Sequence, residues 1–201
     1  LEAMFQLRHR IYVEQRGWSA LARSDGREID QFDTDDAVYL LGIDDNGNIT
    51  AGLRLIPTLK PHLMRDVFSH LVIWGQVPND PRIYEATRCF VAESKPGERS
   101  QQLAGEIFCA AFEYGLSNGL THISLVCDAF FVPMMLENGW GIRPLGIPVP
   151  YDEGTCIAVL IEVSARSVFS TRAQRRMNPN PLVFSPTPPP FAHPELYPIA
   201  A

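Results

Sequence analysis

Apolar residues recur along the chain with two different periods, and the period separates helical from extended segments. Over residues 3–13 they keep the 3–4 spacing of an amphipathic helix. Unbroken apolar runs over 37–43 and 49–56 predict two buried strands, joined by a turn of hairpin type at 44–48. Between the helix and the first strand, residues 19–36 show neither period. A long irregular segment in a compact domain usually binds something.

The rest of the pattern alternates helices with strands. We expect a short helix over 62–70, a strand over 82–91, a helix capped by Ser100 and running to 118, a strand over 122–127, a helix over 130–138, and strands over 142–145 and 155–163. The helix ending at 118 is apolar on most sides and predicts a right-handed parallel crossover between its flanking strands. This order predicts an α/β fold, a three-layer α-β-α sandwich with a mixed twisted sheet. Splaying of strands 82–91 and 122–127 would open a cleft.

Proline usage divides the chain into two parts. Eight of the 17 prolines fall in residues 178–201, which we expect to be an extended or disordered tail behind one domain over residues 1–177. Because the sequence opens inside a helical pattern, we expect further residues ahead of Leu1. The sequence has no internal repeats.

Composition narrows the class of protein. The chain is 46% hydrophobic and 20% charged, as globular proteins are, and its net charge of −6 argues against a nucleic-acid binder. No apolar run approaches the roughly 20 residues that span a bilayer. The four cysteines lack metal-ligand spacing and predict free thiols in the cytoplasm rather than a zinc site or disulfides.

Charge is unevenly placed. Residues 163–194 hold no acid and four arginines, which are Arg166, Arg172, Arg175 and Arg176. Such a basic segment is typical either of a solvated tail or of a docking site for an acidic partner. The irregular segment instead carries the acids Glu28, Asp30, Asp33 and Asp35. Arg54 lies inside an apolar strand, where a lone charge is very costly, so these acids are its natural partners.

Strand 82–91 carries the main candidate chemistry. Glu85 and Arg88 lie three residues apart and would fall on opposite faces of a regular strand, so they converge only through a bulge or a twist. They are either two solvated charges on a half-exposed strand or a functional pair beside a cleft, where shifted pKa values are useful.

Five motifs in order resemble the LuxI-type acyl-homoserine-lactone synthases, which make quorum-sensing signals. They are Leu7-Arg8-x-x-x-Tyr12, Gly17-Trp18, Glu28-x-Asp30-x-Phe32-Asp33, Arg54-Leu55-x-Pro57-Thr58 and Glu85-x-x-Arg88-x-x-Val91. The resemblance covers about residues 4–163. The family usually has Phe in place of Tyr12 and Ser in place of Thr87.

The resemblance implies an acyltransferase with a fold similar to that of the GNAT acetyltransferases. The amine of S-adenosylmethionine attacks an acyl thioester carried by acyl-carrier protein or coenzyme A, and lactone closure then expels methylthioadenosine. S-adenosylmethionine is a substrate, so neither a cofactor nor a metal is implied. The partners are these two substrates, without nucleic acid or membrane span.

The residues suit this chemistry. A sulfonium cation calls for an aromatic face, acids and an arginine, which Trp18, Asp30 and Asp33 with their neighbours can supply. Glu85 is the candidate general base, and Arg88 would orient carboxylates. A backbone N–H near 89–91 is a candidate oxyanion donor. The set expected to bind S-adenosylmethionine and order the loop is Arg8, Tyr12, Trp18, Asp30, Asp33, Arg54 and Arg88. The same charged side chains also read as an ion-pair network that orders the loop, and several can do both.

An acyl chain needs an apolar tunnel. The candidates are Leu125, Cys127, Phe130, Met134 and Trp140, each of which also suits ordinary core. Relatives that make 3-oxo signals tend to carry a hydroxyl where this chain has Leu125, so we expect an acyl chain without a 3-oxo group.

The donor and two other functions stay open. The GNAT pyrophosphate motif is not cleanly present in residues 94–105, which favours a carrier-protein donor, with the arginines of 166–176 as a dock, although some family members use coenzyme A thioesters. The alternatives are a GNAT-like N-acetyltransferase acting on a different amine and a non-enzymatic module that binds an adenosyl ligand.

Overall fold

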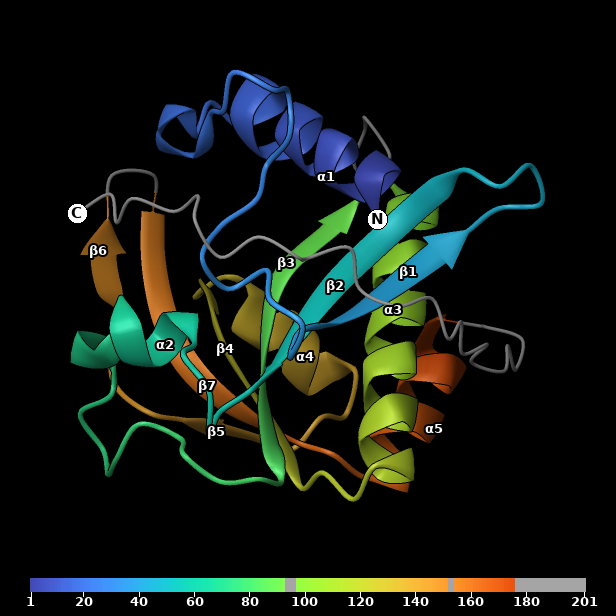
Figure 1. Cartoon of the computed structure of the whole chain (residues 1–201). Coiled ribbons are helices and arrows are strands. Elements are labelled where there is room, and N and C mark those ends of the chain that lie inside the picture. Colours follow the sequence, from blue (N-terminus) through green and yellow to red (C-terminus); the bar gives the residue numbers. More distant parts are fainter. Residues whose placement is uncertain (93–96, 152–153, 176–201) are drawn as a thin grey trace.

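A mixed sheet forms the middle layer of the molecule (Figure 1). The computed structural model describes residues 1–92, 97–151 and 154–175. Its strands are β1 (Val38–Ile43), β2 (Ile49–Pro57), β3 (Ile83–Val91), β4 (His122–Asp128), β5 (Ile142–Pro144), β6 (Val149–Tyr151) and β7 (Gly154–Glu162). They lie in the order β1-β2-β3-β4-β7-β5, with β6 also paired to β7. Of the pairings in the described part, β3 with β4 is parallel and the others are antiparallel.

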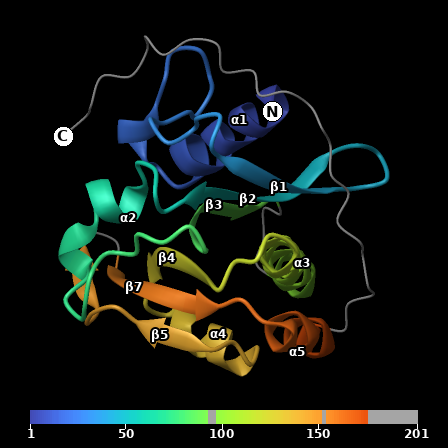
Figure 2. The ribbon, with the colours of Figure 1, turned by 60° about the horizontal axis from the view of Figure 1, so that its bottom comes forward.

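Helices cover both faces of this sheet, which gives the three layers seen edge-on in Figure 2. One face packs against the long helix α3 (Glu98–Ser117) together with α4 (Phe131–Glu137) and α5 (Ala165–Arg175). The other face is covered at one end by α1 (Glu2–Arg8) and the π-helical turn η1 (His9–Gln15), and at the other by α2 (Leu63–Asp66) and the 3-10 turn η3 (Ser69–Leu71). The α/β fold with a mixed sheet is therefore confirmed.

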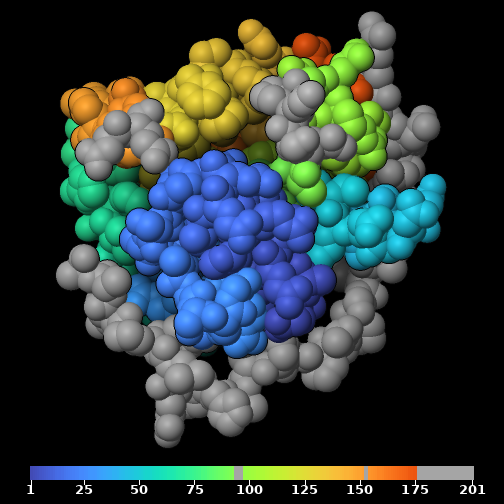
Figure 3. Space-filling view, turned by 90° about the horizontal axis from the view of Figure 1, so that it is seen from above, coloured from blue at the N-terminus to red at the C-terminus, as the bar shows by residue number. Residues whose placement is uncertain are grey.

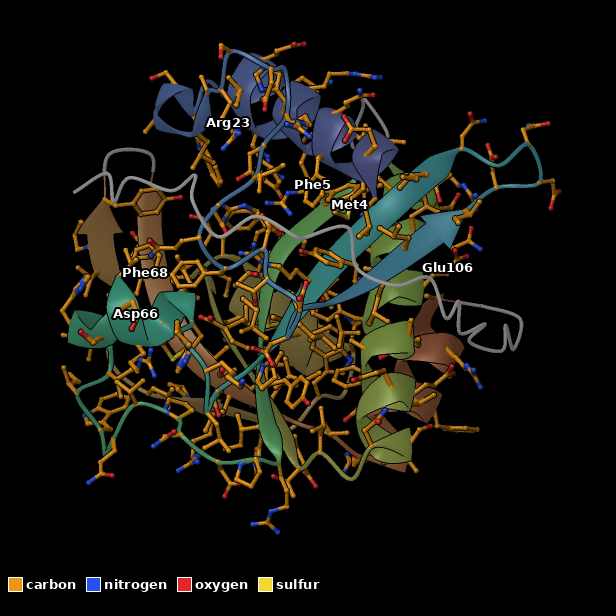
Figure 4. The ribbon with its side chains drawn as sticks, viewed as in Figure 1. Met4, Phe5, Arg23, Asp66, Phe68 and Glu106 are labelled. Atoms are coloured by element: carbon orange, nitrogen blue, oxygen red, sulfur yellow. The ribbon has the colours of Figure 1, made fainter. Side chains whose placement is uncertain are left out.

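The largest apolar core lies between the sheet and α3. Alternate strand residues such as Leu53, Leu55 and Ala86 meet Ile107, Phe108 and Phe112 of the helix. On the opposite face, Met4 and Phe5 of α1 point towards β2 and β3 (Figure 4). Burial of a large apolar side chain contributes about 1.5–3 kcal/mol, so this packing holds the N-terminal helix on the sheet.

The crossover from β3 through α3 to β4 positions the centre of the sheet. The two parallel strands pair only from Ile83 with His122 to Glu85 with Ser124, although β3 continues to Val91 and β4 to Asp128. Beyond Glu85 the pairing stops and the strands separate, as the sequence predicted.

Three expected elements need correction, and one strand must be added. The helix expected over 62–70 is two separate turns, α2 and η3. Gly97, not Ser100, is the N-cap of α3, and the Ser100 hydroxyl reaches back to it. The first helix extends through the π-helical residues to Gln15. Strand β6 was not expected.

The arginine-rich segment from residue 163 to Arg175 is part of the folded domain and not a solvated tail. It forms α5, which packs against α3, and Thr171 accepts a hydrogen bond of 2.6 Å from the indole N–H of Trp140. The Arg172 guanidinium pairs with Glu113. Arg176 and the expected proline-rich tail lie outside the described residues.

No helix in the described ranges has the length and hydropathy needed to cross a membrane.

Candidate active site

Strand β3 brings Glu85 and Arg88 to the same face of the sheet through a bulge. Arg54 of β2 pairs with Thr87 and Gly52 pairs with Phe90, so two residues of β3 stand opposite one residue of β2. Arg88 takes up the extra length with φ of +51°, in the left-handed region. Of the two ways in which the sequence allowed this pair to reach one face, a bulge or a twist, the structure has the bulge.

The N-terminal helix sends one arginine into the loop that follows it. Arg8 donates from Nε to Glu28 at 2.5 Å and from both terminal nitrogens to Asp33 at 2.8 and 2.9 Å. Asp33 also accepts a hydrogen bond of 2.8 Å from the Tyr39 hydroxyl. These contacts fasten the irregular segment to α1. Viewed from above, the N-terminal residues form a continuous surface beside the segment of α4 (Figure 3).

Two more arginines approach the same carboxylates from the sheet. Arg54 donates to both oxygens of Asp30 at 2.6 and 3.0 Å and to the Thr87 hydroxyl at 2.9 Å. Arg88 lies 2.9 Å from Glu28 and 2.7 Å from Asp30. Three arginines and three carboxylates thus form one network, defined here as the loop network: Arg8, Arg54, Arg88, Glu28, Asp30 and Asp33.

The loop network is internally neutral and almost wholly buried. Burial alone would raise the pKa of Asp30, but the charges of Arg54 and Arg88 outweigh it and hold that pKa well below its usual range. Only Asp30, with 16% of its side chain exposed, and Arg88, with 10%, reach the surface. Each carboxylate already has an arginine partner, so the network orders the loop whatever else it binds.

Glu85 lies beside this network but is held by backbone. Its carboxylate is fully buried and accepts hydrogen bonds of 2.7 Å from the N–H groups of Leu63 and Met64 at the start of α2. Burial raises the pKa of Glu85 to about 7, against the opposing pull of those two N–H groups and of Arg54. A carboxyl that titrates near neutrality suits a general acid or base.

Aromatic rings lie at the edge of the loop network. Tyr12 and Trp18 stack with ring centroids 5.2 Å apart, and the Arg16 guanidinium covers both rings. The Tyr12 hydroxyl donates to the carbonyl oxygen of Cys89. That bond ties η1 to β3 at the bulge itself.

Of the residues expected to hold an acyl chain, four lie in or against the main core and one is exposed. Leu125 and Trp140 are buried in the main core, with Cys127 and Met134 packed partly buried against it. Phe130 does not line an enclosed space, because 71% of it is exposed and its ring contacts only the tilted ring of Phe131 among the aromatic contacts of the described residues. Phe130 precedes the first turn of α4, so its side chain lies outside the packed face of that helix.

Sequence reasoning left several site groups out. Glu28 was noted as an acid and as part of a motif but not placed in the site, although it links Arg8 to Arg88. Tyr39 reads as an ordinary strand residue, and its contact with Asp33 depends on how the loop folds. The two backbone N–H groups that hold Glu85 carry no side-chain signal at all.

Other chemistry finds no support in the described residues. No grouping of His, Cys, Asp and Glu there could hold a metal ion. All four cysteines are free thiols, and burial raises the pKa of Cys89 and of Cys127 to about 12, which leaves both thiols unreactive at neutral pH.

Comparison with known proteins now places the chain. The family model for autoinducer synthase matches residues 1–170. The isovaleryl-homoserine lactone synthase of Bradyrhizobium diazoefficiens is 35% identical over 168 residues, which are 84% of this chain and 75% of that protein.

Solved structures agree with this match. The coenzyme A-dependent acyl-homoserine lactone synthase BjaI, with S-adenosylmethionine and isopentyl-coenzyme A, superposes with a TM-score of 0.79 at 34% identity over 88% of this chain and 82% of that one. The coenzyme A-dependent synthase MesI gives 0.81 at 37% identity, over 90% and 89%. An N-acetyltransferase from Lactobacillus plantarum, at a TM-score of 0.56 and 18% identity over 81% and 90%, shares the fold alone. The chain belongs to the autoinducer synthase family, and it is an acyl-homoserine-lactone synthase with a GNAT-like fold.

Proposed function

We propose that this synthase transfers an acyl group from an acyl-coenzyme A thioester to the amine of S-adenosylmethionine, with Glu85 as the general base. The observation that carries the proposal is the buried Glu85 carboxyl, with a pKa raised to about 7, beside the loop network and at the point where β3 and β4 separate. The donor is chosen because BjaI and MesI, both about a third identical to this chain, are coenzyme A-dependent. A carrier-protein donor is the alternative.

In the first step the amine loses a proton to Glu85, directly or through a water, and its nitrogen attacks the thioester carbonyl. A carbon–nitrogen bond forms and the carbon–sulfur bond breaks. The nitrogen gives up its second proton, and the leaving thiolate takes it and departs as the thiol. In the second step a carboxylate oxygen of the amino-acid part attacks the carbon attached to the sulfonium. The lactone closes and methylthioadenosine leaves without any change of oxidation state.

The loop network and its aromatic edge supply the contacts for the sulfonium substrate. Asp30 and Arg88 are its two partly exposed members, so we assign the carboxylate of the substrate to Arg88 and the neighbourhood of its sulfonium charge to Asp30. Of the stacked pair Tyr12 and Trp18, the partly exposed Trp18 ring is the aromatic surface for the adenosyl sulfonium, and the buried Tyr12 supports it from below. Arg8, Arg54 and Asp33 are more deeply buried and hold the loop in place.

The acyl chain is placed on the α3 side of the separating strands, near Leu125. Two aromatic contacts fill that side, Trp140 with Phe108 at 4.9 Å and with Phe112 at 5.1 Å between ring centroids. Bulky rings leave little room for a long chain, so the proposal includes a short acyl group without a 3-oxo substituent. The substrates are intracellular metabolites, which fits a cytoplasmic enzyme.

The test is product analysis with two thioester donors. Purified protein is incubated with S-adenosylmethionine and either acyl-coenzyme A or acyl-carrier protein, and thiol release, methylthioadenosine and lactone are measured together. We expect the three products in equal amounts, and at least 100-fold less in Glu85→Gln. If thiol is released without methylthioadenosine or lactone, the acyl group goes to an acceptor other than the amine of S-adenosylmethionine, and the proposal is wrong.

The donor has its own control. Arg166→Glu reverses an exposed charge on α5 and should leave the KM for acyl-coenzyme A unchanged. If carrier protein is the better donor and this variant raises its KM strongly, the coenzyme A assignment is wrong and α5 is a carrier dock.

A further inference from the structure

Two residues that neighbour Glu85 in the fold each carry a buried polar atom without a hydrogen-bonding partner among the described residues. They are Nε2 of His62 and Oγ of Ser124, and both side chains are 0% exposed. Buried polar side chains are nearly always paired, because leaving one unpaired costs free energy. Two such atoms beside one titratable carboxyl therefore point to a ligand.

Ser124 is the neighbour of Glu85 across the sheet. The two residues are Cα partners in the last parallel pair before β3 and β4 separate. Partners on adjacent strands lie about 4.8 Å apart and project to the same face. The Ser124 hydroxyl is thus on the Glu85 face, whereas Leu125 projects into the core on the other side.

His62 approaches Glu85 from the opposite layer. It is the N-cap residue of α2, directly before Leu63 and Met64, whose N–H groups hold the carboxylate. Its Nδ1 lies 2.9 Å from the carbonyl oxygen of Lys60. That oxygen only accepts, so Nδ1 carries the proton and Nε2 presents a lone pair. Burial lowers the pKa of His62 and keeps the ring neutral at neutral pH, with Arg65 acting in the same direction and Asp66 against it.

We propose that His62 and Ser124 complete, with Glu85, a binding site for the group that gives up its proton during acyl transfer. The ligand is a small hydrogen-bond donor, either the ammonium of S-adenosylmethionine or one water molecule that relays its proton. An ammonium has three N–H donors, and the site offers three acceptors: the carboxylate, the imidazole nitrogen and the hydroxyl oxygen. His62 and Ser124 are positioning residues, and the proton itself goes to Glu85. This inference rests on the proposed function.

The first experiment removes each group and restores it. Ser124→Ala and His62→Phe should each lower kcat at least tenfold. Ser124→Thr keeps a hydroxyl and His62→Gln keeps an acceptor, so each of these should show a kcat at least twofold higher than the Ala or Phe variant at the same position. The pH at which kcat is half-maximal should also shift in the Ala and Phe variants, because the neighbours of the Glu85 carboxyl change. Ser170→Ala on α5, on the far face of the sheet, is the control and should keep the kcat of the parent.

The second experiment separates a site from a structural role. Methylthioadenosine lacks the amino-acid part, so its Kd by calorimetry should stay within twofold in all variants. The Kd of S-adenosylmethionine should rise about tenfold if the ammonium binds directly and stay constant if a water relays the proton. A parallel loss of methylthioadenosine affinity and kcat, or an unchanged kcat in both Ser124→Ala and His62→Phe, overturns the inference.

The proposed function fails in a different way. If the parent protein releases no methylthioadenosine from S-adenosylmethionine and acyl-coenzyme A, the reaction assignment falls. In that case a tenfold rise of the S-adenosylmethionine Kd in the variants would keep the site as an ammonium site. Equal affinities would remove it, because without acyl transfer there is no proton for a water to relay.

Discussion

At the scale of single residues, Glu85 shows how opposing effects set a pKa. Two backbone N–H groups and Arg54 favour the ionised carboxylate, while complete burial opposes it, and burial prevails. The loop aspartates are also buried, yet the arginines beside them win and keep their pKa values low. Direct contact with an arginine makes the difference, because among the described residues none donates a guanidinium hydrogen bond to Glu85.

The titration of Glu85 predicts the pH dependence of the reaction. A base must be ionised, so kcat/KM should fall about tenfold per unit as pH drops below about 7 and level off above it. A pH–rate profile of the wild-type protein measures this, and Glu85→Gln should lose the dependence together with the rate. A profile whose limb lies below pH 5 would contradict the assignment of Glu85 as base.

The raised pKa of Glu85 also predicts how the stability of the folded protein changes with pH. The folded pKa of Glu85 is raised above its unfolded value of about 4.5, so the folded state binds this proton more tightly. That contribution is fully present below pH 4.5 and is lost as pH rises through about 7, in all about 3 kcal/mol. Urea unfolding of Glu85→Gln should therefore show less decline in stability between pH 5 and 8 than the wild type, and equal declines would exclude the shift.

Arg8 tests whether the loop network is one unit. Arg8→Ala leaves Glu28 and Asp33 buried without one of their partners, so unfolding should become easier by about 3–5 kcal/mol. Arg23→Ala in the same loop is the control, because its pair with Asp25 is exposed and contributes less than about 1 kcal/mol. Chemical denaturation of both variants gives the comparison. Equal effects would mean that the network is not cooperative.

At the scale of elements, the bulge in β3 decides which face Arg88 occupies. Before it, Glu85 and Thr87 face the loop network and Ala86 faces α3, as regular alternation requires. Arg88 should then face α3, but the extra residue returns it to the network side. An αL backbone at a non-glycine residue costs about 1 kcal/mol, which the ion pairs with Glu28 and Asp30 offset.

The left-handed backbone conformation of Arg88 predicts that a glycine at this position relieves strain. Arg88→Gly and Arg88→Ala both lose the guanidinium, but only glycine adopts φ of +51° freely. The glycine variant should therefore be the more stable by about 1 kcal/mol, although alanine is usually the better strand residue. Thermal unfolding of the pair measures the difference, and a more stable alanine variant would show that the backbone relaxes after the side chain is removed.

Elements with a strong apolar period were predictable, and those without one were not. Strands β2, β3, β4 and β7 and the helix α3 lie within three residues of their expected ends. Helix α5 was missed because few of its residues are apolar: it is held by single polar contacts, such as Thr171 with Trp140, that no pattern reveals. The expected helix over 62–70 is interrupted at Val67 and Phe68, where the backbone leaves the helical conformation, and the apolar pattern does not mark this break.

At the scale of the whole molecule, the site is assembled from segments far apart in sequence. The loop network joins Arg8 to Glu28, 20 residues away, and Glu28 to Arg88, 60 residues away. The sequence predicted that Arg54 would pair with acids of the loop, because a buried arginine needs a charge partner. It could not pair them, since three arginines and four loop acids allow many arrangements and only the folded loop selects one.

The layered architecture also bears on the acyl chain, because the α3 side of β4 is both the main core and the proposed acyl site. Leu125 lies there with 6% of its surface exposed. We expect the wild-type product to lack a 3-oxo group, since leucine cannot donate a hydrogen bond to that oxygen. Leu125→Thr should raise the ratio of kcat/KM for 3-oxoacyl- over acyl-coenzyme A about tenfold relative to Leu125→Val, because one hydrogen bond to the substrate contributes about 1.4 kcal/mol. Valine matches threonine in shape and loses the same packing, so the comparison isolates the hydroxyl. A wild-type product that is mainly a 3-oxo lactone, or equal ratios in the two variants, would place the acyl chain elsewhere in the fold.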